Sequence, residues 1–137
     1  MPRLVLVLIL AIVCGCTPSS SRNGATADVA VTDETEAMVG KWGAESEVSL
    51  IVSRVGDRIV LAAPENDTWR MDISDARLDG DSICYIQKNF LHSGEYHPFN
   101  GVECNTRIRL IDADTIEMKL TTVHSPDPEA EQLVRIK

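Results

Sequence analysis

The sequence is poor in basic and in aromatic residues. Its 137 residues include 13 lysines and arginines against 21 aspartates and glutamates, and only two each of Trp, Tyr and Phe. An acidic chain repels phosphate backbones, which argues against nucleic-acid binding. It also argues against docking on anionic lipid through basic patches. The charge would suit a basic partner, although solubility alone explains it.

Long apolar runs are missing from most of the chain. The run Leu4–Val13 follows Arg3 and is too short for a helix that spans a bilayer, which takes about 20 residues. A positive residue followed by an apolar run of this length is typical of a secretory signal peptide. The sequence therefore predicts export from the cytoplasm.

The residues after this run resemble the lipobox of bacterial lipoproteins. Val13-Cys14-Gly15-Cys16 has an aliphatic residue and a Gly before the acceptor Cys, with Cys14 in place of the usual Leu, Ser, Thr or Ala. The resemblance implies a signal peptide over residues 1–15 and a lipid anchor on Cys16, stable when it carries two or more acyl chains. Thr17, which is not the Asp of inner-membrane retention, favours the outer membrane facing the periplasm. The alternative is an ordinary secretory signal with unrelated cysteines.

The chain after residue 15 changes character once. Removal of residues 1–15 leaves 122 residues with 12 basic and 21 acidic side chains, a formal charge of −9. Residues 16–38 are small, polar and acidic without an aromatic, which predicts the lipidated Cys and a flexible tether. Residues 39–137 are enough for one small domain.

Period-2 alternation dominates residues 39–137. Residues 102–110 and 116–120 alternate apolar and polar side chains, and Asp79-Gly80 predicts a hairpin turn because Gly supplies the positive φ. We expect an all-β fold, a small antiparallel meander of seven or eight strands. Because consecutive hairpins must hide one face and two edges, the meander should form a closed or nearly closed barrel.

The domain contains two cysteines, Cys84 and Cys104. The exported compartment is oxidising, which predicts a disulfide between them. A hairpin folded about Ser93-Gly94 would place the two opposite each other, and closing a loop of about 20 residues would stabilise the fold by roughly 3 kcal/mol. The alternative is two free, buried thiols.

Two family resemblances concern the domain. Gly40-Lys41-Trp42 ahead of a meander resembles the calycin superfamily, especially short lipocalin-like domains. That likeness implies that Trp42 closes one end of the barrel, that Gly40 gives the backbone room, and that the barrel binds a small apolar ligand. Ser93-Gly94-Glu95-Tyr96 is similar to the Ser-Gly-x-x-Tyr loop of membrane-bound lysozyme inhibitors, one residue shorter. That likeness implies an inhibitor or immunity-type protein that blocks an envelope hydrolase through residues 91–101.

Candidate binding residues concentrate in the same loop. It joins two strands, and rigid scaffolds commonly present adaptable binding loops, although a plain long connection is an equal reading. Trp42 and Trp69 are candidates to line a pocket, or else to fill the core. Histidines and carboxylates of the loop match no metal signature, no catalytic triad is evident, and we expect a non-enzymatic protein without a cofactor. The candidate binding residues are Trp42, Trp69, His92, Ser93, Glu95, Tyr96, His97 and Phe99.

Overall fold

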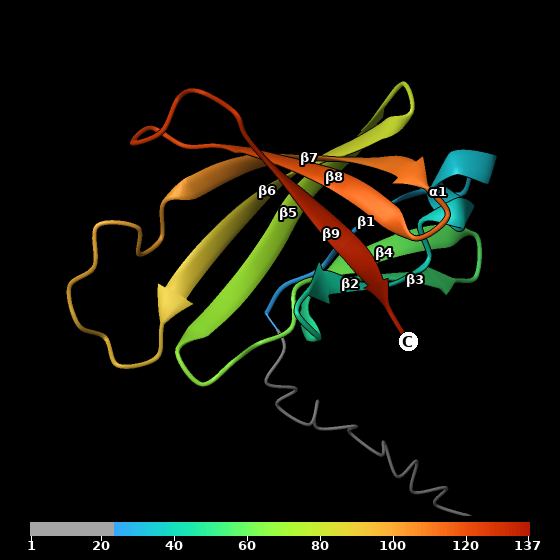
Figure 1. Ribbon diagram of the computed structural model, residues 1–137. Helices are drawn as coiled ribbons and strands as arrows, with labels where there is room; N and C mark the ends of the chain where they lie inside the picture. The colour runs from blue at the N-terminus through green and yellow to red at the C-terminus, as the bar shows by residue number, and fades with distance from the viewer. Residues whose placement is uncertain (1–23) are drawn as a thin grey trace, which may run out of the picture.

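The structure is a computed structural model that describes residues 24–137 (Figure 1). The predicted all-β antiparallel fold is confirmed, with nine strands in the described chain instead of seven or eight. The signal peptide and Cys16 lie outside the described residues. Within residues 24–137 no helix is long and apolar enough to cross a membrane. In chain order the elements are β1 (Ala27–Ala30), α1 (Asp33–Ala37), β2 (Gly40–Ala44), β3 (Glu47–Val55), β4 (Arg58–Ala62), β5 (Trp69–Asp79), β6 (Ser82–Leu91), β7 (Glu103–Asp112), β8 (Thr115–Thr121) and β9 (Glu129–Ile136).

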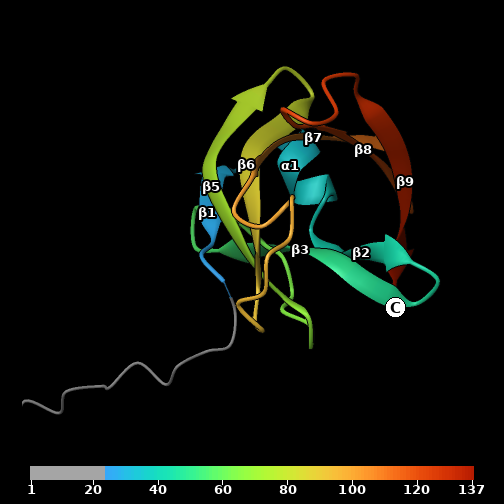
Figure 2. The same ribbon diagram turned by 90° about the vertical axis from the view of Figure 1, so that its left-hand side faces the viewer.

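The strands form a nearly closed barrel. Strands β2 to β9 run as a meander, and β9 pairs back onto β2. The remaining gap between β4 and β5 is occupied by β1, which pairs antiparallel with β4. On the other side of β1, the carbonyl of Ala25 accepts a hydrogen bond from the Ile73 N–H at 2.8 Å. Figure 2 shows the strands as a ring, with α1 seen through its opening.

The segment expected to be a flexible tether is partly folded, and this corrects the predicted domain boundary. Residues 27–30 form β1, and α1 begins with a capping box in which the Thr32 hydroxyl accepts from the Thr35 N–H and Thr35 Oγ1 accepts from the Thr32 N–H. Val29 and Met38 are buried in the core. The averaged composition of the segment gave no sign of these two buried apolar side chains. The folded part of the chain therefore includes residues 27–38, which lie before the predicted boundary at residue 39.

The core fills the barrel interior with side chains from every second strand position. The predicted alternation is confirmed on β7, where Thr106 and Ile108 are buried while Arg107 and Arg109 are exposed. The Asp79-Gly80 turn is also confirmed, since Gly80 has φ +62° between β5 and β6. Each fully buried Leu or Ile side chain stabilises the fold by about 1.5–3 kcal/mol. The largest aliphatic contributors are Leu50, Ile59, Leu61, Ile73, Ile83, Ile108, Ile116 and Leu133.

The predicted disulfide between Cys84 and Cys104 is absent, because both cysteines are free in the described chain. Cys84 is paired with Arg107, and Cys104 with Gln87. This register centres the β6–β7 hairpin between residues 95 and 96, not at residue 94. Cys84 therefore lies on the outer face, whereas Cys104 lies on the inner face with Thr106. Side chains on opposite faces of a sheet point apart and cannot be bridged.

Candidate functional site

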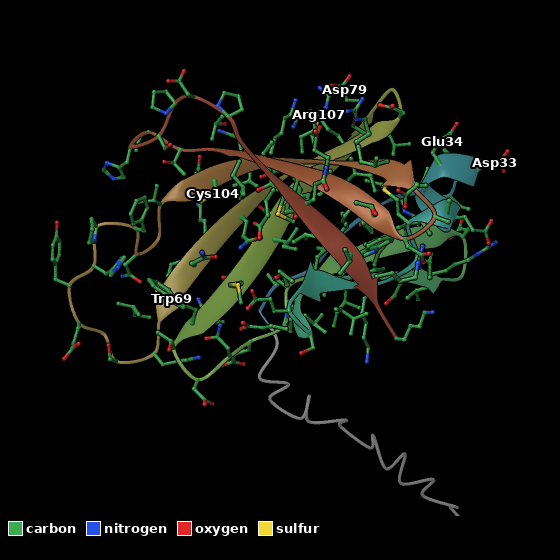
Figure 3. All side chains as sticks on the ribbon, viewed as in Figure 1. Asp33, Glu34, Trp69, Asp79, Cys104 and Arg107 are labelled. Carbon is green, nitrogen blue, oxygen red and sulfur yellow. The ribbon has the colours of Figure 1, made fainter. Side chains whose placement is uncertain are left out.

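The two ends of the barrel are built differently. At one end lie α1 and the tight turns β3–β4, β5–β6 and β7–β8. At the other end, which we call the mouth, lie the β2–β3 turn and the longer connections 63–68, 92–102 and 122–128. Figure 1 shows the 92–102 loop and α1 at opposite sides of the molecule. Figure 3 likewise shows Trp69 on the mouth side and Asp33 and Glu34 on the side of α1.

Trp42 closes the end of the barrel that carries α1. Its side chain is fully buried, and Nε1 donates a hydrogen bond to the Met38 carbonyl at 2.7 Å. The guanidinium of Arg135 stacks over the indole at 4.3 Å from the ring centroid. Gly40 has φ +154°, and a Cβ there would collide with the Arg135 guanidinium. This end is therefore a packed plug.

Arg135 joins three elements of the plug. It lies on the inner face of β9, two residues after the buried Leu133. Its guanidinium donates to the carbonyls of Ala37 at 3.1 Å and Val39 at 2.6 Å, and to the Ala113 carbonyl at 2.8 Å. Our sequence reasoning missed Arg135. The available signal was a basic residue at a position in phase with the apolar face of the last strand.

The mouth opens into a cavity of about 440 Å³. Its apolar lining comes from three strands: Val48 on β3, Met71 on β5, and Met118 and Leu120 on β8, with the polar Gln87 on β6 beside them. Its acidic lining consists of Glu47, Glu65 and Glu131. A hollow with an apolar interior and a few polar groups at its opening has the general character of a ligand site.

Glu65 is the most enclosed of these carboxylates, with 17% of its side chain exposed. Its Oε1 lies 3.0 Å from His92 Nε2, which is also 3.0 Å from the Asn66 carbonyl. The His92 N–H donates to the Thr68 carbonyl at 3.1 Å. Oε2 of Glu65 is buried and has no hydrogen-bond partner among the described residues. His92 therefore fastens the 63–68 connection to the 92–102 loop and holds Glu65 at the cavity.

A row of rings lies along the rim of the mouth. Trp69 and His97 stack edge to face at 5.1 Å between centroids, His97 and Phe99 are 5.8 Å apart, and Phe99 and His124 are 5.5 Å apart. Tyr96 stands outside the row and is 93% exposed. The row connects β5 with the 92–102 and 122–128 loops, so it stiffens the rim.

The structure separates several residues that the sequence grouped together. Trp42 and Trp69 lie at opposite ends of the barrel, and neither lines the cavity. His92 engages Glu65, whereas His97 Nδ1 accepts from the Phe99 N–H. Across residues 24–137, no group of three or more His, Cys, Asp or Glu side chains is arranged to hold a metal ion.

Ser93 and Glu95 take part in loop structure. Ser93 Oγ accepts a hydrogen bond from the Glu95 N–H at 3.3 Å, and both residues are exposed. Glu65 and Glu131, which line the cavity, were not among the candidates. The segment Pro64-Glu65-Asn66-Asp67 consists of turn-forming residues, which give no local sign that Glu65 lines the cavity at the barrel mouth.

Burial makes two ionisable groups of the inner face, the Tyr85 phenol and the Cys104 thiol, weaker acids. Burial raises the pKa of the Tyr85 phenol far above its ordinary value, and it also raises the pKa of the Cys104 thiol. Both groups stay neutral near pH 7, so neither is an activated nucleophile.

Comparison with known proteins adds no assignment. No protein-family model, no curated protein and no solved structure matches the chain.

Proposed function

We propose that this protein is a membrane-anchored lipoprotein that acts as a non-enzymatic binding module, with a small molecule of largely apolar character held in its barrel. The observation that carries the proposal is the cavity of about 440 Å³ at the mouth. Ligand pockets commonly have volumes of about 300–1,000 Å³. The Trp42–Arg135 plug at the other end supports a barrel with one entrance, as the likeness to short lipocalin-like domains implies.

The anchor would keep this entrance close to the membrane. The lipobox resemblance supports lipidation of Cys16, and only residues 17–23 separate that Cys from the first described residue, Gly24. The next residue, Ala25, donates its N–H to Asp72 Oδ1 at 2.9 Å, near the mouth end of β5. Eight extended residue steps reach at most roughly 30 Å. The proposed location is the outer membrane, with the domain facing the periplasm.

The test of the binding function is a probe titration. The mature chain with Cys16→Ser, which needs no detergent, is titrated with the neutral fluorophore N-phenyl-1-naphthylamine. We expect saturable binding that Leu120→Trp abolishes, because the larger side chain fills the cavity. Ile111→Trp is the matched control, since Ile111 is 45% exposed at the other end of the barrel. Absence of saturable binding to the parent chain would refute the proposal.

A second candidate function has one observation in its favour. The 92–102 loop projects from the barrel (Figure 1), and it carries Tyr96 at 93% and Phe99 at 43% exposure. Such a loop, on an acidic domain, suits an inhibitor of a basic envelope hydrolase such as lysozyme. Replacement of Tyr96 and His97 by Ala should then abolish hydrolase binding. The same double variant should leave binding of the fluorophore unchanged.

A further inference from the structure

The charges that face the cavity are of one sign. Glu47, Glu65 and Glu131 line it, and none of the described residues around it is a Lys or Arg. Basic side chains of the neighbouring strands lie on the outer face, where Arg107 pairs with Asp79 and Arg109 with Glu117. The inward Arg135 is committed to carbonyls at the closed end. The entrance therefore has a negative electrostatic potential.

Glu65 lacks a donor that it needs. Its Oε1 is engaged by His92, but the buried Oε2 receives no hydrogen bond from any residue between 24 and 137. A buried carboxylate oxygen without a donor costs free energy, more than a neutral polar atom does. His92 is thus the only basic side chain that engages Glu65 among the described residues, and an ammonium group in the cavity, with its positive charge and three N–H donors, would compensate the acidic lining.

The cavity also offers an apolar surface beside these carboxylates. Met71, Met118 and Leu120 line it, and flexible methionines adapt readily to hydrocarbon chains of different shape. Met118 and Glu131 are directly paired across β8 and β9. An apolar wall and a carboxylate thus stand side by side at one position of the barrel.

We propose that the ligand of this barrel is an organic cation: a primary amine whose ammonium binds Glu65, flanked by Glu47 and Glu131, and whose apolar body packs on Met71, Met118 and Leu120. This inference rests on the proposed binding function and names its ligand class. A neutral lipid would leave the three carboxylates without a counter-charge, and an anionic one would be repelled by them.

The experiment compares three probes of equal chain length: decylammonium, decanol and decanoate. Each is titrated by calorimetry into the mature chain with Cys16→Ser. One charge-assisted hydrogen bond contributes roughly 1.5–3 kcal/mol, so decylammonium should bind about 10- to 100-fold more tightly than decanol. Decanoate should bind most weakly.

Variants locate the charge recognition. Glu65→Gln and Glu131→Gln should each weaken decylammonium binding and leave decanol binding unchanged. Glu117→Gln is the matched control, because Glu117 is on β8 but on its outer face, paired with Arg109. If Glu117→Gln weakens decylammonium as much as Glu65→Gln does, the affinity comes from general acidity and the inference fails.

The outcomes separate the two proposals. Equal affinity for decylammonium and decanol, or tightest binding of decanoate, would overturn the cationic ligand while the binding function stands. Failure of all three probes to bind would overturn the binding function and the inference with it. Loss of decylammonium binding in Glu65→Gln and Glu131→Gln, but not in Glu117→Gln, would support both the binding function and the cationic ligand.

Discussion

Arg135 should contribute more to the stability of this protein than any other charged residue on β9. Its guanidinium makes hydrogen bonds to the carbonyls of Ala37, Val39 and Ala113, and it stacks on Trp42. The perturbation is Arg135→Met, which keeps an unbranched side chain and removes the charge and the donors. The variant leaves the Val39 and Ala37 carbonyls at the plug without their donor.

The magnitude follows from these contacts. A hydrogen bond from a charged group contributes about 1.5–3 kcal/mol when buried, and a cation–π contact contributes about 0.5–2 kcal/mol. The Arg135 side chain is 25% exposed, so water replaces part of what is lost. We expect a loss of about 2–4 kcal/mol in the free energy of unfolding, a large share of the roughly 5–15 kcal/mol of a typical domain.

The assay is urea unfolding of the mature chain with Cys16→Ser, followed by tryptophan fluorescence and circular dichroism. The control is Arg109→Met, which removes an exposed ion pair with Glu117 at 3.2 Å and should cost at most about 1 kcal/mol. Arg135→Lys should lose an intermediate amount of stability, because an ammonium lacks the planar fork of donors with which the guanidinium reaches three carbonyls. If Arg135→Met and Arg109→Met unfold at the same urea concentration, with equal m-values, the plug does not depend on the guanidinium.

Three further predictions follow from the fold. The exported protein should have the mass of two free thiols, and Cys84→Ser with Cys104→Ser should unfold near the parent's urea midpoint; a mass two hydrogens lighter would contradict the separation of the cysteines on opposite faces. Truncation to residues 39–137 should abolish cooperative unfolding, because it removes β1, α1 and the buried Met38; a sharp transition in that fragment would show that β1 is dispensable. Burial raises the pKa of Tyr85 in the folded state, so the free energy of unfolding is independent of this group below about pH 10 and falls as the pH rises further. Between pH 8 and pH 11, the urea midpoint of unfolding should fall less for Tyr85→Phe than for the parent.

Tyr85→Phe also probes the interior directly. The Tyr85 hydroxyl is buried without a hydrogen-bond partner in the described chain, which costs roughly 1–3 kcal/mol. Its removal should therefore leave stability at pH 8 unchanged or raise it. Tyr85 lies on the inner face of β6, two residues from Gln87, but does not itself line the cavity, so the probe affinity should be unchanged in this variant.

The positions of the strands were predictable because they depend on patterns among neighbouring residues. On β7 the alternation of Thr106 and Ile108 with two arginines determines which face is buried, and Gly80 supplies the positive φ that its turn requires. Such patterns act over a few residues and do not depend on distant parts of the chain. The position of Trp42 had a different source: the likeness of Gly40-Lys41-Trp42 to short lipocalin-like domains implied that Trp42 closes one end of the barrel, and its side chain is fully buried.

Pairing register and long-range contacts were decided only by the tertiary structure. The β6–β7 hairpin is centred between residues 95 and 96 and not at residue 94 as predicted, and this register places Cys84 and Cys104 on opposite faces. No residue near either cysteine signals that shift. In β1 only Val29 is buried, so the sequence of this strand has no alternating pattern that would predict it. Its place follows from the gap that β4 and β5 leave between them. Glu65 and Arg135 acquire their surroundings from chain segments far away in sequence. By itself the sequence determined an all-β, nearly closed barrel; its pairing register, the Arg135 contacts of its plug and its acidic mouth follow from contacts that exist only once the chain has folded.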